Sequence, residues 1–285
     1  MPLPDDLHMR VADEPDLPAI ASLRESVEWV ALDWALRAVL EPPDARCLVV
    51  VDADDAIVGV GSGISYGPFG FVGNMVVAEH HRRRGVGAAI LEAILDFLDN
   101  RGCTRLELFA TDSGRPLYSR YGFVLTGPST SALLPRSTPI EADPSVEIAE
   151  GHDIDELSRY DAPRFGGNRR PLLAMMTADP ARPLLAAHRE GRMVAYAWLR
   201  LDGPRIGPFL ADSPEDAASL LAEAFHRFPQ VDALGMHLPS ANAAGIRWLQ
   251  RTGVELDRWD GRMARGPQIP RRDETIYGNL VGALG

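Results

Sequence analysis

The sequence places three arginines and two glycines between an apolar strand and a helix. The segment reads Arg82-Arg83-Arg84-Gly85-Val86-Gly87, and the helix opens at Ala88. Backbone N–H groups at a helix N-terminus, exposed by a glycine turn, form a site that binds phosphate. Gly85 lets the backbone turn closely, Gly87 removes side-chain bulk, and the arginines add charge-assisted hydrogen bonds to an anion. A solvated arginine run before an ordinary helix is the alternative, but it gives no reason for the glycines. The loop therefore predicts phosphate binding.

Apolar periodicity predicts the elements that must position this loop. Two helices open the chain, a hairpin with an acidic turn follows, and a further strand leads into the arginine-glycine loop. A long amphipathic helix, a strand, a short helix and a last strand complete the first half. In chain order these elements span Asp13–Leu23, Val27–Leu40, Cys47–Gly61, Phe71–Val77, Ala88–Arg101, Arg105–Ala110, Gly114–Tyr121 and Gly122–Leu125. This order predicts an α/β (α+β) domain with a mixed, mainly antiparallel sheet flanked by helices.

The second half of the chain repeats this order in abbreviated form. Proline, serine and threonine accumulate after residue 128, which predicts a linker over 129–145 between domains at 1–128 and 146–285. The segment Leu117–Phe123 lines up with Trp248–Val254. Two tandem copies of one fold are therefore expected.

The first half resembles the GCN5-related N-acetyltransferases, the GNAT superfamily. The matching residues are Val77 at the end of a strand, the loop Arg82–Gly87, and Leu117–Phe123 with its Tyr and Gly-Phe. The resemblance implies acetyl-CoA as the acyl donor, with a splayed strand that pairs with the pantetheine arm and a pyrophosphate bound by the amides of Arg83 to Ala88. The implied cofactor-binding residues are Met75, Val76, Val77, Arg82, Arg83, Arg84, Gly85, Val86, Gly87 and Ala88.

The same resemblance implies that Tyr118 is the general acid that protonates the departing CoA thiolate. A phenol with a pKa of about 10 can protonate a thiolate whose pKa is about 8.5 if it lies within hydrogen-bond reach. A tyrosine on a short amphipathic helix can also simply pack in the core. The amide of Val77 is a candidate donor to the oxyanion. No general base is assigned, because several carboxylates border the expected site, namely Glu25, Glu28, Asp33 and Glu79.

The second copy lacks the residues of this chemistry. Ile206–Asp212 stands where the loop would be, without arginine or Gly-x-Gly, and Leu249 replaces Tyr118. This half resembles the GNAT-like C-terminal domain of a bacterial group of tandem acetyltransferases, through Asp161–Arg169, Ile206–Pro208, Gly261–Met263 and Ile276–Gly278. One hypothesis gives its early loop a share of the acceptor pocket; the other has the loop charges satisfy one another. The candidate acceptor residues are Glu28, Asp161, Arg164, Phe165 and Arg169.

Composition excludes several other classes of protein. The formal charge is -11, and all 29 basic residues are arginine, which argues against nucleic-acid binding and favours a cationic acceptor or a merely soluble surface. No apolar run is long enough for a signal peptide or a membrane span, so a cytoplasmic protein is expected. Cys47 and Cys103 have no metal-ligand or disulfide spacing and are expected to be buried. No metal site is predicted.

Taken together, these features predict an acetyl-CoA-dependent N-acetyltransferase for a small amine or amino-acid-like acceptor. Two alternatives remain at this point. One is a non-catalytic acyl-CoA-binding sensor with the second domain as its output surface. The other is an enzyme that acetylates proteins or peptides, which would need an open groove for its substrate.

Overall fold

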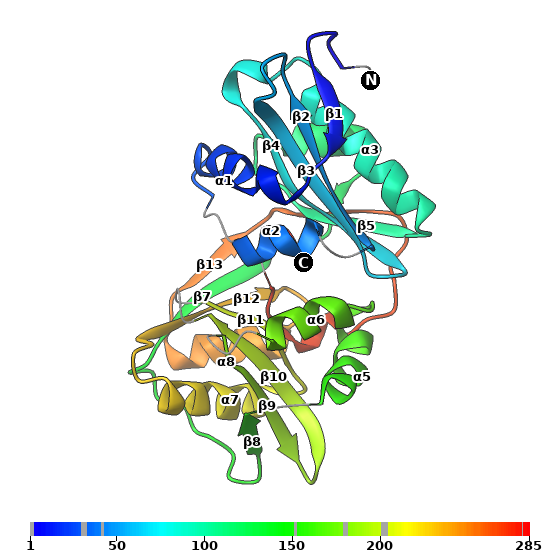
Figure 1. Cartoon of the computed structure of the whole chain (residues 1–285). Helices are drawn as coiled ribbons and strands as arrows, with labels where there is room; N and C mark the ends of the chain where they lie inside the picture. The colour runs from blue at the N-terminus through cyan, green and yellow to red at the C-terminus, as the bar shows by residue number, and fades with distance from the viewer. Residues whose placement is uncertain are drawn as a thin grey trace. The chain divides into compact units, whose positions relative to one another are not determined.

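The computed structural model describes residues 3–29, 33–40, 43–150, 153–178, 182–200, 205–280 and 282–285, and divides the chain into two compact units (Figure 1). The first unit comprises Met1–Leu125, Met263–Ile269 and Val281–Gly285, and the second comprises Thr126–Arg262 and Pro270–Leu280. Both units are mixed sheets flanked by helices, and most neighbouring strands are antiparallel. The expected fold class is confirmed.

The first unit is built on a seven-stranded sheet with the order β1-β2-β3-β4-β5-β14-β6. Strands β1 to β4 pair antiparallel, whereas β4 and β5 run parallel. Helix α3 packs on one face through Ile90, Ile94 and Leu98, and α1 and α2 lie against the other (Figure 1). Its elements are β1 (His8–Val11), η1 (Glu14–Asp16), α1 (Leu17–Glu25), α2 (Asp33–Leu40), β2 (Ala45–Val51), β3 (Ile57–Ser65), β4 (Phe69–Val77), η2 (Glu79–His81), α3 (Val86–Asn100), β5 (Arg105–Phe109), α4 (Arg115–Arg120), β6 (Val124–Leu125) and β14 (Arg262–Arg265).

The second unit is built on an eight-stranded sheet with the path β13-β7-β12-β11-β10-β9-β8, and β15 pairs with β11 off that path. Helix α7 packs against β9, β10 and β11, and its Leu220, Leu221 and Phe225 are buried in the core. The elements are β7 (Ser129–Pro135), β8 (Glu147–Glu150), α5 (Ile154–Phe165), α6 (Arg170–Thr177), β9 (Leu184–Arg189), β10 (Arg192–Arg200), β11 (Arg205–Ala211), α7 (Pro214–Arg227), β12 (Ala233–Pro239), α8 (Ala243–Thr252), β13 (Leu256–Trp259), η3 (Asp273–Thr275) and β15 (Ile276–Gly278).

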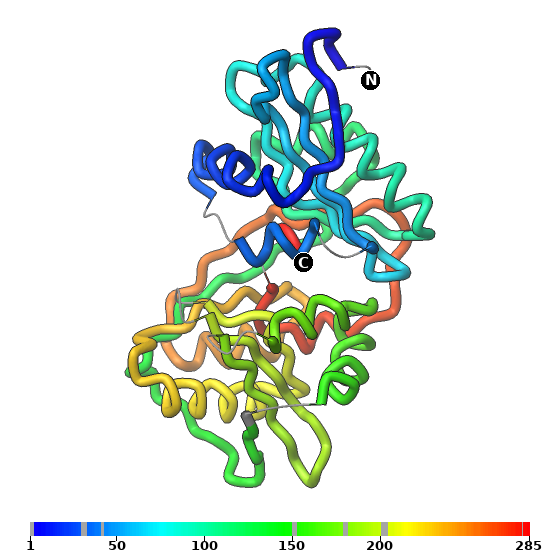
Figure 2. Tube along the Cα trace, viewed as in Figure 1, coloured from blue at the N-terminus to red at the C-terminus, as the bar shows by residue number. Residues whose placement is uncertain are grey.

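Two strands are exchanged between the halves of the chain. Strand β7, which follows the first half in sequence, inserts between β12 and β13 of the second sheet, with Ala132 opposite both Met236 and Leu256. Strand β14, near the C-terminus, inserts between β5 and β6 of the first sheet, with Met263 opposite Leu125. The last residues also return to the first unit (Figure 2), where the Tyr66 hydroxyl donates to the Leu284 carbonyl at 2.6 Å.

Several boundaries differ from the sequence-based expectation. The segment 129–145, expected to be a linker, contains β7 because its alternating residues Ala132 and Leu134 face the core of the second sheet. Of the helix expected over Val27–Leu40, residues 27–29 are not helical, α2 covers Asp33–Leu40, and residues 30–32 lie outside the described residues. Strands β1, β8, β14 and β15 were not predicted; each spans only three or four residues, too few for a clear period. Both cysteines are free and buried, as expected.

Candidate active site

A cleft of about 1030 Å³ opens in the first unit where β4, β5, α3 and α4 end or begin. It is lined by eight of the ten predicted cofactor-binding residues, by Tyr118 and by Glu28. The eight are Met75, Val76, Val77, Arg82, Arg83, Gly85, Gly87 and Ala88. Residues from three separate stretches of sequence thus meet in one hollow.

The loop between β4 and α3 presents free backbone N–H groups to this cleft. Arg83 has a φ of 60° and Gly85 a φ of 88°, so two left-handed residues curl the chain just before the helix. Gly85 is the N-cap of α3 and supplies no side-chain cap, and the first backbone bond back to it comes from Ala89. The amides of Val86 to Ala88 therefore have no partner within the helix. This is the geometry that binds a phosphate or pyrophosphate.

The three consecutive arginines point to different places. Arg82 donates from Nε to the Val77 carbonyl at 3.0 Å, which ties its guanidinium to the end of β4, and Arg83 is exposed at the cleft. Arg84 instead donates to both carboxylate oxygens of Asp6, at 2.7 and 2.9 Å. Two of the three arginines are thus placed for an anion in the cleft.

The last residues of β4 form an open backbone edge. Strand β5 pairs with β4 only from Phe69 to Val72, so the two strands separate beyond that point. The amide of Ala78 donates to the Val58 carbonyl on the β3 side at 2.8 Å. Because successive amides of a strand point to opposite sides, the N–H of Val77 points away from β3, towards the gap beside β5. The strand pairing therefore shows the predicted splay, in which the end of β4 separates from β5.

Tyr118 lies on α4 with its ring packed and its hydroxyl unpaired. The side chain is 6% exposed and contacts Phe123 edge-to-face, with ring centroids 6.2 Å apart. Its hydroxyl makes no hydrogen bond within the described residues, and burial alone raises its pKa to about 12. The phenol is therefore neutral at physiological pH and available as a donor. Gly114 leaves room for it, since a Cβ there would lie 3.1 Å from the ring.

Of the four carboxylates considered as a base, Glu28 is the one that lines the cleft. It follows α1 in a turn with a φ of 61°, and its carboxylate makes no hydrogen bond or ion pair with the described residues. Glu79 lines a different hollow beside α1, and neither Glu25 nor Asp33 lines the cleft. The geometry thus singles out Glu28 where sequence alone left four possibilities.

The four acceptor candidates from the second half belong to the second unit, where three lie on α5 and Arg169 is the N-cap of α6. Asp161 and Arg169 form an ion pair at 2.7 Å, with side chains 1% and 2% exposed, and the Tyr196 hydroxyl donates to the same carboxylate. Arg169 stacks over Phe165, with its guanidinium carbon 3.8 Å from the ring centroid. Within the second unit these side chains therefore satisfy one another, as one of the two hypotheses expected.

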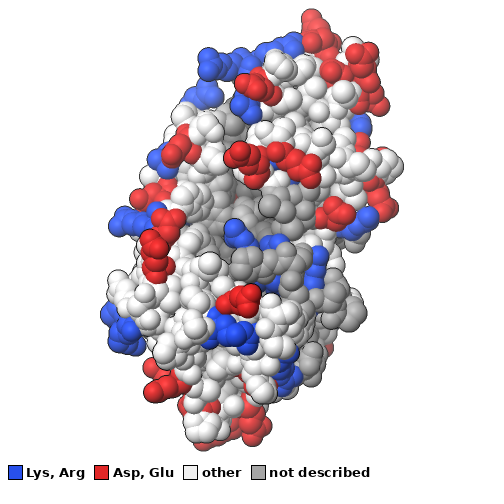
Figure 3. Space-filling view, turned by 90° about the vertical axis from the view of Figure 1, so that its left-hand side faces the viewer, with Lys and Arg blue, Asp and Glu red and all other residues white. Residues whose placement is uncertain are grey.

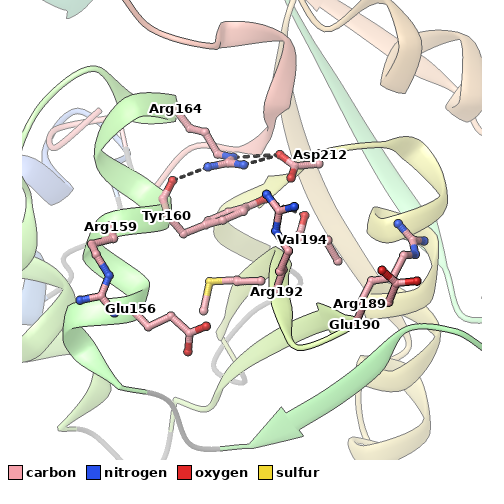
Figure 4. A pocket seen from close by; sticks show the side chains of 10 residues that line it. Glu156, Arg159, Tyr160, Arg164, Arg189, Glu190, Arg192, Val194 and Asp212 are labelled. Carbon is pink, nitrogen blue, oxygen red and sulfur yellow. Dashed lines mark hydrogen bonds and ion pairs between the residues drawn. The ribbon is translucent and has the colours of Figure 1, made fainter.

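Arg164 lies in a separate cavity of the second unit, about 610 Å³ in volume (Figure 4). It donates to Asp212 at 2.6 Å and to the Tyr160 carbonyl at 2.7 Å, and it stacks over the Tyr160 ring at 3.5 Å. Other arginines and carboxylates share the rim of this cavity (Figure 4). The Arg164 guanidinium is thus held by its own unit.

In the second unit, a strand of the chain itself fills the gap that corresponds to the cleft. Strands β11 and β12 pair parallel only at Arg205 and Gly235, and β15 pairs antiparallel with β11 beyond that point. Gly207 permits this close approach, because a Cβ there would lie 2.0 Å from the Asn279 carbonyl oxygen. Leu249, in the place of Tyr118, is fully buried. The second unit therefore has no open edge for a pantetheine arm at this position.

Several residues that line the cleft were not predicted from the sequence. Trp29 lies in the turn after α1, Phe109 ends β5, and Arg120 ends α4. Phe109 could have been found, since the end of the strand parallel to β4 must face the splay. Trp29 and Arg120 carry no such signal, because only the folded chain brings a turn and a helix end to the same hollow.

Three further features concern surface charge, membrane-spanning helices and metal ligands. On the face drawn in Figure 3, acidic and arginine side chains are interspersed and no single basic patch is seen. No helix in the described ranges is long and apolar enough to cross a membrane. Within those ranges there is also no group of side chains suited to hold a metal ion.

Comparison with sequence families gives two matches, one in each half. Residues 10–123 match the profile described as the Acetyltransferase (GNAT) family, and residues 157–278 match a second profile described as an Acetyltransferase (GNAT) domain. An uncharacterized N-acetyltransferase, YitH, from Bacillus subtilis is 26% identical over 227 residues, which cover 77% of this chain and 78% of the relative. A mycothiol acetyltransferase from Sanguibacter keddieii is 27% identical over 276 residues, covering 87% and 84%.

Solved structures share the fold of the whole chain. A putative acetyltransferase from Pyrococcus horikoshii superposes with a TM-score of 0.81 at 23% identity, covering 100% of this chain and 98% of that one. A tandem GNAT protein from the clavulanic acid biosynthesis pathway gives a TM-score of 0.66 at 15% identity, covering 92% and 99%. At such identities the likeness shows the fold alone.

Proposed function

Because the chain belongs to the GNAT acetyltransferase superfamily, as a member with two tandem domains, we propose that it transfers the acetyl group of acetyl-CoA to a small amine or amino-acid-like acceptor. The observation that carries the proposal is the single cleft that contains the phosphate loop, the open edge of β4 and the Tyr118 hydroxyl. Each of these three features suits a different part of an acyl-CoA reaction.

The donor would bind along the loop and the strand. The pyrophosphate lies on the amides of Arg83 to Ala88, assisted by the guanidinium groups of Arg82 and Arg83. The pantetheine arm pairs with the backbone of Met75 to Val77, which β5 leaves open. The thioester then lies at the end of β4, next to α4 and Tyr118.

The reaction is attack by the neutral amine nitrogen on the thioester carbonyl carbon. A C–N bond forms, and the carbonyl oxygen becomes an oxyanion that the Val77 N–H stabilises. The C–S bond then breaks, the thiolate takes a proton from Tyr118, and the amine nitrogen loses a proton. Glu28, directly or through water, accepts that proton, since it is the carboxylate among the described lining residues. The products are the N-acetylated acceptor and CoA.

Two observations support a small, cationic acceptor over a protein substrate. The chain carries a formal charge of -11, and Glu28 adds a negative charge where the amine would approach. One relative is named a mycothiol acetyltransferase, a name that denotes a small-molecule acceptor. A sensor that binds acyl-CoA without turnover is the second candidate, and the neutral, unpaired Tyr118 hydroxyl favours the enzyme over it.

The test is a thiol-release assay with acetyl-CoA and a panel of amines, amino acids, polyamines and aminoglycosides, run on the wild type and Tyr118→Phe. Loss of a general acid lowers kcat by about 100-fold or more, whereas the dissociation constant for CoA, measured by calorimetry, should not change. Tyr121→Phe is the matched control, because Tyr121 follows the same helix but its hydroxyl bonds to Glu92 at 2.7 Å outside the cleft.

If the wild type turns over an amine, and Tyr118→Phe loses this turnover but still binds CoA, the protein is an enzyme and Tyr118 is its acid. CoA binding without turnover of any amine would favour the sensor. A wild-type protein that does not bind CoA would refute the proposal.

A further inference from the structure

A bulge in β4 sits directly before the residues that would hold the thioester. Ser62 pairs with Gly73 and Val60 with Val76, so β4 uses three residues where β3 uses two. Asn74 occupies the bulge with a φ of 55°, a left-handed conformation that asparagine adopts more readily than most residues. The bulge bends the strand and redirects the residues after it. The orientation of Met75 to Val77 therefore depends on how Asn74 is held.

The Asn74 side chain is held from two elements. It is 2% exposed, its Nδ2 donates to the Ser62 hydroxyl of β3 at 2.9 Å, and its Oδ1 accepts from Nη1 of Arg24 in α1. A buried amide is costly unless its hydrogen bonds are made, and these bonds fix which way it faces. The bulge is thus locked to both the neighbouring strand and the covering helix.

Arg24 also anchors the opposite wall of the cleft. It lies in the last turn of α1 and is 7% exposed, and burial lowers its pKa. Its carbonyl accepts from the amides of Val27 and Trp29, both at 3.1 Å, and its guanidinium lies 5.9 Å from the Trp29 ring. The turn that it organises carries Glu28 and Trp29 into the cleft. Arg24 therefore contacts the donor strand, β4, through its side chain. Through its backbone it contacts the acceptor-side turn, residues 26–29.

We propose that Arg24 and Asn74 are positioning residues that set the donor strand in register with the acceptor-side turn, so that the thioester and the amine meet in reactive geometry. This inference rests on the proposed acetyltransferase function. Neither residue lines the cleft, so neither touches substrate. Misplacement of reacting groups by about 1 Å lowers rates by about 100-fold without removing a catalytic group.

The discriminating variant is Asn74→Gly, which keeps the left-handed backbone but removes both side-chain hydrogen bonds. We expect kcat to fall at least about tenfold, whereas the dissociation constant for acetyl-CoA, governed by the phosphate loop, changes less than about threefold. Asn74→Asp accepts from Arg24 and from the Ser62 hydroxyl, so it should retain most of the activity. Adding Arg24→Gln to Asn74→Gly should lower kcat by less than the product of the two single effects, because the two residues share one contact.

The matched control is Asn242→Gly in the second unit. Asn242 is also a fully buried asparagine; it caps α8 and donates to the Ile276 carbonyl at 2.9 Å. Its loss should lower the melting temperature without changing kcat. If Asn74→Gly does not fold, as judged by circular dichroism, Arg24→Gln alone provides the same test.

The outcomes separate the two proposals. An active wild type whose Asn74→Gly variant keeps its kcat would overturn this inference and leave the acetyltransferase intact, as would an equal loss in Asn74→Asp. A wild type that neither binds acetyl-CoA nor releases thiol would overturn the function itself. A fall in kcat with unchanged acetyl-CoA affinity, restored by Asn74→Asp, would support both.

Discussion

Tyr118 combines a packed ring with an unpaired hydroxyl. Phe123 holds the ring and Gly114 leaves space beside it, so the position of the oxygen is fixed by packing. Burial keeps the phenol neutral by raising its pKa to about 12. The packing role and the catalytic role that the sequence left as alternatives are thus compatible, because the ring can serve one and the hydroxyl the other.

The pKa of Tyr118 predicts the alkaline side of the pH–rate profile. A general acid acts while it is protonated, that is, below its pKa, and a value of about 12 keeps Tyr118 protonated throughout the assay range. We expect kcat/KM to rise as the acceptor amine loses its proton and to show no decline up to about pH 10. Initial rates between pH 6 and pH 10 test this. A decline with a midpoint near pH 9 that disappears in Tyr118→Phe would show that the phenol ionises far earlier than its burial implies.

The loop before α3 depends on a left-handed residue at the N-cap. Gly85 has a φ of 88°, where a Cβ is strained by about 1 kcal/mol. In Gly85→Ala we expect the loop to relax away from the phosphate geometry and the acetyl-CoA dissociation constant to rise about tenfold, by calorimetry.

Gly102→Ala is the control for this substitution. Gly102 follows α3 at its other end with a φ of 78°, and a Cβ there would meet no atom within 4 Å. It should lose comparable stability and keep its affinity for acetyl-CoA. Equal losses of affinity in both variants would mean that the effect comes from stability and not from the loop.

The position of β15 predicts a single acetyl-CoA site per chain. It pairs with β11 at Phe209 and Leu210. This edge of β11 corresponds to the edge of β4 that stays open in the first unit. Titration of acetyl-CoA by calorimetry should therefore give a stoichiometry of one per chain. Adding Gly85→Ala should weaken that single site. A second binding event that survives this substitution would show that β15 leaves its position in the second unit.

The exchange of β7 and β14 makes each unit depend on the other half of the sequence. Met263 of β14 is 1% exposed and belongs to the core of the first unit, although it lies more than 130 residues beyond β6. The two sequence halves therefore show the pattern of two copies of one fold, but they are not two segments that fold independently.

A fragment comprising residues 1–128 should not fold on its own. It lacks β14, which leaves an edge of β5 unpaired and removes Met263 from the core, a loss of about 2–5 kcal/mol for the side chain alone. We expect a broad, non-cooperative thermal transition by circular dichroism. The same fragment joined through a flexible linker to residues 262–269 should regain cooperativity. Cooperative unfolding of 1–128 by itself would contradict this account.

Sequence patterns were most informative where the chemistry is local. The phosphate loop is one continuous segment, and its glycines and arginines have a physical reason that needs no distant partner, so its placement could be read from Arg82 to Gly87. The long helix α3 and the strands β3 and β4 have enough residues to show their periods. The contact between Arg84 and Asp6 was not predicted, because the two residues lie 78 positions apart in the sequence.

The sequence by itself therefore determined the repeated fold, the loop and the tyrosine, because these depend on period, turn chemistry and residue type within short windows. Tertiary structure decided the rest. The position of Glu28 at the cleft, the burial of Asp161 with Arg169 and the pairing of β15 with β11 depend on which distant segments meet. The exchange of β7 and β14 has the same cause, since a short strand fits either sheet by its pattern and only the available edge decides which one it joins.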